Sequence, residues 1–316
     1  MQDGRWWAIA LSEALVPGGT LAVACEGEEL ALFRDSAGDV FALEDRCPHR
    51  RVPLSLGPVV PGGLQCPYHG WTFEGVSGRC VGIPNLRSDE RVSQRYAARA
   101  FAVCELNGFI HVWRGVGTAG GRVSAYDYQC GGPEYTGEAV IPISLDAYRD
   151  VMLDGPQCLF EFSGVKITDF FYGDPRREGD HLRLDRGAVW RGKGQRPAFV
   201  RDFPLVLRTR VPVLGGDVWV ELLDGDEQPL MSIMLAASEN LRGTTRLCWR
   251  GFVHPRALRG ASFEWWLRRL IRRSPFVPVA SIEGAELAAL AVAPSRERQA
   301  WAAGRQDATR MMEGAQ

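Results

Sequence analysis

The sequence has few of the features that mark membrane-bound, secreted or nucleic-acid-binding proteins. No uncharged apolar run reaches about 18 residues, which excludes an ordinary membrane-spanning helix. The first residues, Met1–Leu15, contain no basic segment followed by a long apolar one, so we expect no signal peptide. The formal net charge is only −1, so no overall field favours nucleic acid or an anionic membrane. We therefore expect a cytoplasmic protein without a nucleic-acid or membrane partner.

Histidine is scarce, and cysteine is irregularly placed. The 316 residues include five histidines and eight cysteines. Irregularly spaced cysteines in a chain of this length do not form the disulfide framework of a small secreted domain. Six of them have mostly apolar neighbours and are expected to be buried thiols: Cys25, Cys80, Cys104, Cys130, Cys158 and Cys248. The other two, Cys47 and Cys66, fall in short motifs with histidine.

Short apolar or alternating runs between turn residues predict a β-rich first domain. These runs are Leu21–Cys25, Leu30–Arg34, Val40–Leu43, Gly63–Cys66 and Gly108–Trp113. A glycine-rich segment then covers residues 115–121, which is typical of a linker. We therefore expect two domains, residues 1–116 and residues 117–316.

The second domain has a different pattern. Helical spacing of apolar residues covers Leu145–Leu153, and a strand-rich stretch runs from about residue 160 to residue 252. Alternation is clearest in Arg210–Leu214, Val218–Leu222 and Leu230–Ala236. Two further helices are expected at Ser262–Arg273 and Ser281–Val292. Strands and helices without regular βαβ alternation predict an α+β domain built on an antiparallel sheet.

Two motifs combine one cysteine with one histidine each. Cys47-Pro48-His49 is followed, after sixteen residues, by Cys66-Pro67-Tyr68-His69. Two such loops brought together offer two sulfurs to one iron and two imidazole nitrogens to the other, which is the ligand set of a Rieske [2Fe–2S] cluster. A zinc site and coincidence are the alternatives, but zinc motifs usually pair Cys with Cys and His with His. We therefore predict a Rieske cluster held by Cys47, His49, Cys66 and His69.

These residues resemble the Rieske domain of the Rieske non-haem iron oxygenases, in the alpha-subunit family. Flanking pieces match as well: Trp6-Trp7, Val81–Pro84 and Gly108–Trp113. The resemblance implies an all-β Rieske domain followed by a helix-grip (StAR-like) domain, in which two histidines and a carboxylate hold a mononuclear Fe(II). It also implies a trimeric ring in which each cluster feeds the iron of its neighbour across a bridging aspartate. A reductase or ferredoxin would supply the electrons.

The loops also differ from those of respiratory Rieske proteins. Respiratory proteins have an extra, disulfide-bonded cysteine in each loop and a serine after the glycine of the second loop. Here Arg50-Arg51, Tyr68 and Trp71 occupy these regions. With fewer hydrogen bonds to the sulfurs, we expect a reduction potential low in the Rieske range of roughly −150 to +300 mV.

The chain departs from the family at the mononuclear iron motif, which is Asp, two residues, His, four residues, His. In the matching segment, Asp154 corresponds to the bridging aspartate. Gln157 and Phe162 stand at the two histidine positions, and Gly284 stands at the position of the carboxylate ligand. A glutamine carbonyl is a weak ligand for Fe(II), and a phenyl ring or a glycine offers none. We therefore expect the mononuclear Fe(II) to be absent.

The number of histidines supports this expectation. Beyond the two cluster ligands and His111 in the first domain, only His181 and His254 remain, 73 residues apart. They cannot form a His-x4-His pair on one helix. A relocated iron site, built from them with an acidic residue such as Asp150 or Glu283, stays open.

Three functions are compatible with these patterns. The first is a non-catalytic alpha-like subunit in a mixed ring (a trimer or stacked hexamer), whose cluster passes electrons to the iron of a catalytic homologue. The second is an active Rieske monooxygenase or dioxygenase with an atypical iron site. The third is a cluster-bearing protein that binds a hydrophobic ligand without chemistry. The sequence favours the first, because only the electron-transfer half of the family pattern keeps its ligands.

Overall fold

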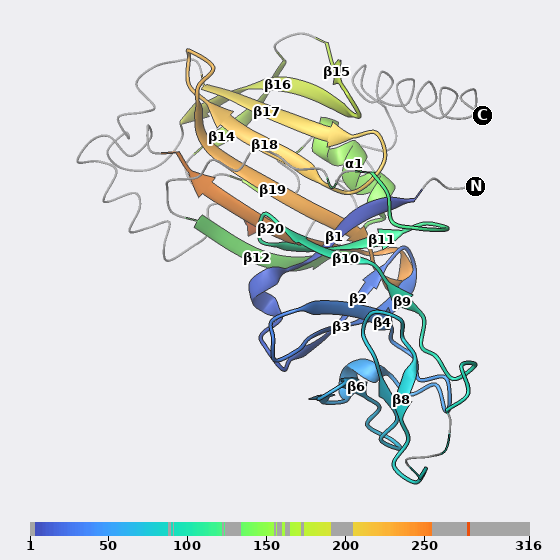
Figure 1. Ribbon diagram of the computed structural model, residues 1–316. Coiled ribbons are helices and arrows are strands. Elements are labelled where there is room, and N and C mark those ends of the chain that lie inside the picture. The colour runs from blue at the N-terminus through green and yellow to red at the C-terminus, as the bar shows by residue number, and fades with distance from the viewer. Residues whose placement is uncertain are drawn as a thin grey trace. The chain divides into compact units, whose positions relative to one another are not determined.

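The computed structural model describes residues 4–87, 90, 92–121, 123, 134–154, 156, 160–161, 165–171, 174–190, 205–254 and 277–278. The chain divides into two compact units (Figure 1). Met1–Tyr128 and Ser238–Arg242 belong to the first unit, and Gln129–Ala237 and Gly243–Gln316 belong to the second. The expected domain boundary between residues 116 and 117 stays a prediction. Within the described ranges, no helix is long and apolar enough to cross a membrane.

The described part of the first unit has three small antiparallel sheets, with strand orders β1-β11-β10, β2-β3-β4-β9 and β5-β6-β7-β8. The strands are β1 (Arg5–Leu11), β2 (Thr20–Cys25), β3 (Glu28–Arg34), β4 (Val40–Glu44), β5 (Val59–Val60), β6 (Gly63–Gln65), β7 (Thr72–Phe73), β8 (Cys80–Gly82), β9 (Ala100–Phe101), β10 (Val103–Leu106) and β11 (Phe109–Arg114). All five strands expected from the sequence in this region are present.

Two tight hairpins in this unit follow directly from local sequence. Asn107 and Gly108 join β10 to β11 with φ angles of +54° and +75°. Glu26 and Gly27 join β2 to β3 with φ angles of +48° and +73°. Two-residue turns with positive φ at both positions match the twist of antiparallel strands, and Asn-Gly is the sequence that favours them most.

The second unit is built on an eight-stranded antiparallel sheet of order β12-β20-β19-β18-β17-β16-β14, with β15 paired to β16. Its strands are β12 (Glu134–Ile141), β14 (Val165–Phe171), β15 (Arg176–Glu178), β16 (His181–Trp190), β17 (Leu205–Pro212), β18 (Val218–Leu223), β19 (Pro229–Glu239) and β20 (Thr245–Val253). A separate short pair joins β13 (Phe160–Glu161) to β21 (Val277–Pro278). The expected α+β class, with an all-β first part and an antiparallel sheet in the second, is confirmed.

Helix α1 (Leu145–Asp154) packs against β17 and agrees closely with the predicted helix. The Ser144 hydroxyl oxygen accepts a hydrogen bond from the Ala147 N–H at 3.2 Å and so caps the first turn. The buried side chains of Tyr148, Val151 and Met152 lie three or four residues apart, which places them toward one side of the helix. The helices predicted at residues 262–273 and 281–292 lie outside the described residues.

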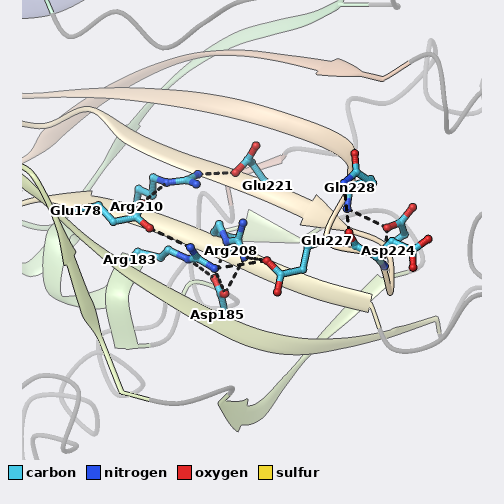
Figure 2. Close-up of polar contacts among 10 residues, drawn as sticks. Glu178, Arg183, Asp185, Arg208, Arg210, Glu221, Asp224, Glu227 and Gln228 are labelled. Carbon is cyan, nitrogen blue, oxygen red and sulfur yellow. Dashed lines mark hydrogen bonds and ion pairs between the residues drawn. The ribbon is translucent and has the colours of Figure 1, made fainter.

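One face of the large sheet carries a network of ion pairs (Figure 2). Its members are Glu178, Arg183, Asp185, Arg208, Arg210, Glu221 and Glu227. Asp185 accepts two hydrogen bonds from Arg208, both 2.9 Å long. Burial acts to raise the pKa of Asp185, but Arg208 and Arg183 outweigh it and lower the pKa to about 2. The alternating run at Arg210–Leu214 overlaps only the end of β17, which starts at Leu205 and also contributes Arg208 to this network.

A buried carboxyl group lies just before β18. Asp217 is 9% exposed, and its Oδ1 has no hydrogen-bond partner among the described residues. Burial raises the pKa of Asp217 to about 7, and the charge of Asp180 acts in the same direction. The fully buried phenol of Tyr148 lies near it, and burial raises the pKa of that group as well. The fold therefore keeps Asp217 protonated at a pH where an exposed aspartate is ionised.

This carboxyl should make the second unit less stable as the pH rises from about 4 to about 7. The folded state keeps a proton that the unfolded state, with an ordinary pKa of 3.8, has already lost. At about 1.4 kcal/mol per pKa unit, the loss approaches roughly 4 kcal/mol at pH 8. Asp217→Asn should remove this slope and raise the urea midpoint at pH 8, whereas Asp174→Asn, at an exposed position, should do neither. An unchanged slope in the Asp217 variant would contradict the prediction.

Candidate metal centre

The two cysteine–histidine motifs lie on loops with the same backbone hydrogen bonds. In the loop after β4, the Cys47 N–H donates to Val52 O at 2.9 Å, and the Arg51 N–H donates to Cys47 O at 2.8 Å. The loop between β6 and β7 repeats the pattern, since the N–H groups of Cys66 and Gly70 donate to partners at 2.8 and 3.1 Å. In each loop, the backbone of the cysteine is therefore hydrogen-bonded to the residues four and five positions after it.

The same position in each loop has a left-handed backbone. The φ angle is +61° at Arg51 and +68° at Gly70. Glycine takes this conformation without strain, and a Cβ on Gly70 would lie only 2.9 Å from Pro84 Cγ. Arg51 takes it as a non-glycine residue, at a cost of about 1 kcal/mol or more. The loops are therefore equivalent in backbone, although His49 stands two residues after its cysteine and His69 three.

The two cysteines lie next to each other in the core of the first unit. Cys47 and Cys66 are 1% and 3% exposed and belong to one apolar cluster. Burial raises the pKa of the Cys47 thiol; the N–H groups of His49 and Arg50 oppose this rise, and the neighbouring Cys66 adds to it. A buried thiol that resists ionisation becomes a thiolate when a metal takes the place of its proton.

The two histidines lie side by side at the surface. The ring centroids of His49 and His69 are 4.9 Å apart, and both residues are exposed. Trp71 stacks on His49 at 4.6 Å with an interplanar angle of 8°, and the Tyr68 ring lies 3.9 Å from that of His69. Trp71 also meets Tyr96 edge-on at 5.2 Å. These aromatic contacts restrict the orientation of two imidazoles that solvent would otherwise leave free.

The donor set fits a two-iron cluster. Buried sulfurs form an inner pair, and exposed imidazoles form an outer pair. A Rieske cluster needs this division, because two thiolates hold one iron and two imidazoles hold the other. A structural zinc ion needs its four donors around one point. In the described ranges, no three His, Cys, Asp or Glu residues are grouped in that way. That Cys47, His49, Cys66 and His69 are the ligands stays a prediction, which this geometry supports.

The positions that correspond to the mononuclear iron site fall largely beyond the described part of the chain. Asp154 is the last residue of α1. Gln157, Phe162 and Gly284 lie outside the described residues. The expected loss of the Fe(II) ligands therefore stays a prediction from the sequence.

The two histidines of the second unit lie on strands far apart in its sheet. His181 begins β16, and its Nδ1 is 2.6 Å from Asp180 Oδ1. His254 follows β20, and its Nε2 is 2.8 Å from Ser232 Oγ. Three strands separate β20 from β16, which corresponds to roughly 19 Å at about 4.8 Å per strand. His181 and His254 therefore do not ligate the same metal ion.

Comparison with known proteins relates the first domain to a sequence family. The family model of the Rieske [2Fe-2S] domain matches residues 5–101. The chain is 36% identical across 112 residues to cholesterol 7-desaturase nvd of Hemicentrotus pulcherrimus, a match that covers 35% of this chain and 24% of that protein. It is 38% identical across 113 residues to the 3-chlorobenzoate-3,4-dioxygenase oxygenase subunit of Comamonas testosteroni, covering 35% and 26%. These matches span only about a quarter of the relatives' own lengths.

Solved structures extend the likeness in fold to the whole chain. Dicamba monooxygenase bound to dicamba matches with a TM-score of 0.72 at 18% identity, covering 99% of this chain and 98% of that one. NdmA of Pseudomonas putida CBB5 with caffeine matches with a TM-score of 0.57 at 16% identity, covering 84% and 78%. The resemblance to the Rieske non-haem iron oxygenases is therefore confirmed in sequence for the first domain and in fold for the whole chain. The Rieske domain supports a [2Fe–2S] cluster.

Proposed function

We propose that this chain is a non-catalytic, alpha-like subunit of a Rieske oxygenase complex. Its cluster would pass electrons to the mononuclear iron of a catalytic homologue. One contrast carries the proposal: the Cys47 and Cys66 loops carry the whole cluster motif and share one backbone hydrogen-bond pattern, whereas Gln157 and Phe162 stand where the family has iron-binding histidines. If the chain only transfers electrons, selection preserves the cluster ligands but not the ligands of the mononuclear iron.

The arrangement of the first unit suits outward electron transfer. When bound, the [2Fe–2S] cluster accepts and releases single electrons. Buried Cys47 and Cys66 keep water from the sulfur end, while exposed His49 and His69 bring the other end to the surface. An exposed imidazole can donate a hydrogen bond to a carboxylate on another subunit. We propose that His69 makes this contact with the partner's bridging aspartate.

The proposed partners are a catalytic homologue in a mixed ring, as a trimer or stacked hexamer, and a reductase or ferredoxin that supplies electrons. Among the relatives, the dioxygenase protein of Comamonas testosteroni is itself named as an oxygenase subunit, and NdmD of Pseudomonas putida is named as an oxidoreductase. We also propose a cytoplasmic location, since the thiols of Cys80 and Cys104 are not in disulfides and a reducing compartment keeps them so.

An active oxygenase with an atypical iron site is the second candidate. The observation that favours it is the extent of the fold match, because the chain covers 98% of dicamba monooxygenase and so includes a whole second domain of that type. A single histidine, combined with residues beyond the described ranges, could still complete an iron site. Metal content separates the two candidates.

The fully loaded protein should contain about two irons per chain, both in the cluster. Reduced protein alone should show no substrate-dependent oxygen consumption, because Gln157, Phe162 and Gly284 cannot complete a facial triad. Iron and acid-labile sulfide analysis on anaerobically purified protein gives the measurement. As a control, Gln157→His, Phe162→His and Gly284→Asp together should raise the iron content toward three. A third tightly bound iron in the unaltered chain, together with hydroxylation of a substrate, would establish the active oxygenase instead.

A further inference from the structure

Two arginines stand directly beside the exposed cluster histidines. Arg50 and Arg51 follow His49 in the chain, and both are exposed. Neither has an acidic partner in the part of the chain that the structure describes. Some other arginines of this unit are ion-paired, as Arg34 is with Glu105 at 2.7 Å. An adjacent pair of uncompensated cations at the cluster end attracts anionic surfaces.

The backbone at Arg51 indicates that its side chain has a use. The equivalent position of the second loop is Gly70, which takes the same left-handed conformation without strain. Arg51 has φ +61°, where a glycine would be more stable. Strained backbone at a functional site persists when the side chain there contributes something that a glycine cannot.

The segment that carries both cluster loops, residues 45–98, is also positively charged. Residues 45–98 contain seven arginines, no lysine and four acidic residues, although the complete chain carries a formal charge of −1. One of the four acids, Asp45, is buried and accepts hydrogen bonds from the N–H and hydroxyl of Ser55 at 2.7 and 2.6 Å. The segment that bears the cluster loops is therefore positive within a slightly negative chain.

Exposed apolar side chains next to the loops indicate a protein partner rather than a small ion. Tyr68 is 60% exposed and contacts the His69 ring, and Leu56 is 72% exposed in the turn after the first loop. Tyrosine and arginine are enriched in protein interfaces, where they combine apolar contact with hydrogen bonds. We call Arg50 and Arg51 the arginine pair.

We propose that the arginine pair docks an acidic surface of the electron-donor protein beside the cluster. This inference rests on the proposed function, because it assumes a cluster that receives electrons from another protein. The donor would bring carboxylates to Arg50 and Arg51 and an apolar patch to Tyr68. Its electron would then enter the cluster through the loop that carries Arg50 and Arg51, and His69 would keep its contact with the catalytic homologue.

Stopped-flow reduction of the full chain tests the docking, with an acidic plant-type [2Fe–2S] ferredoxin and uncharged photoreduced 5-deazariboflavin as the two reductants. At low ionic strength, Arg50→Gln with Arg51→Gln should slow reduction by ferredoxin about three- to tenfold. Added salt should remove the difference, because it screens the charges. Reduction by deazariboflavin should not change. Arg99→Gln, which removes one positive charge elsewhere on this unit, should change neither rate by more than about twofold.

Two single variants separate charge from structure. Arg51→Gly should raise the melting temperature, because it relieves the left-handed strain, and still slow reduction by ferredoxin. Arg51→Lys should keep most of the rate. Equal slowing with both reductants, or unchanged rates with ferredoxin, would overturn the proposal. A defect only in electron transfer from this chain to a catalytic homologue would also overturn the proposal, because the arginine pair would then belong to the contact with that homologue.

The proposed function fails in a different way. A chain without cluster absorbance, or with a third catalytic iron, contradicts the role as an electron-transfer subunit. If the chain holds the cluster together with a third iron, its reduction by ferredoxin still tests the arginine pair.

Discussion

Replacement of His69 by alanine should abolish the Rieske cluster signal completely. The unaltered protein, purified anaerobically, should be brown and, once reduced, give the low-average-g EPR spectrum of mixed histidine and cysteine ligation. His69 is one of two nitrogen donors in the outer pair, and its ring lies 4.9 Å from that of His49. Alanine leaves one iron with a single protein ligand, so the cluster should not assemble as a Rieske centre.

The same replacement should also make the first unit less stable. Cys47 and Cys66 lie in its apolar core, so a chain without the metal keeps two buried thiols in place of metal-bound sulfurs. Because metal binding and folding are coupled in such sites, the His69 variant should also melt at a lower temperature. His254→Gln in the second unit serves as the control and should leave the spectrum unchanged. A colourless protein with stoichiometric zinc would refute the cluster itself.

The sequence alone suffices to propose the cluster ligands, because their pattern is local. Each half of the ligand set lies within four residues, and proline or glycine in the same segment fixes the turn. The aromatic contacts around the ligands were not predictable in the same way. Tyr96 meets Trp71 at 5.2 Å from a segment with no motif of its own, so only the fold brings the two together. The strain at Arg51 also needs the backbone, since nothing in the sequence Arg-Arg indicates a left-handed residue.

Strands with regular alternation or clear turns were predicted with nearly correct bounds, and others were missed. β1 contains Trp-Trp followed by a continuous apolar run and shows no alternation, but its pairing with β11 buries it almost entirely. The alternating run at Arg210–Leu214 overlaps only the end of β17, which begins at Leu205. In the fold, Arg208 and Arg210 project on one face of the sheet and pair with Asp185 and Glu221. Tertiary contacts of this kind override local patterns.

The missing iron ligands are inferred from an alignment over residues 150–162, and their meaning for function depends on the catalytic homologue. The same substitution, made in this chain and in that homologue, tests whether this chain only supplies electrons. If this chain only feeds a catalytic homologue, its own bridging position carries no electrons. Asp154 ends α1, and the positions that follow it in the iron motif are Gln157 and Phe162. The corresponding aspartate of the partner would lie on the path from His69 to the iron.

Asp154→Asn in this chain should therefore leave turnover of the mixed complex within about twofold of the unaltered complex, because no iron lies beyond it. The same change in the catalytic partner should lower turnover by about 10–100-fold or more, since it removes a carboxylate that orients and couples the metal ligands. Product formation with excess reductase, measured on complexes reconstituted from separately purified chains, gives both values. Loss of the cluster through His69→Ala in this chain should reduce turnover as steeply as the partner's aspartate variant. Equal losses from both aspartate variants would show that the second domain of this chain accepts electrons, and the active-oxygenase function would replace the one proposed.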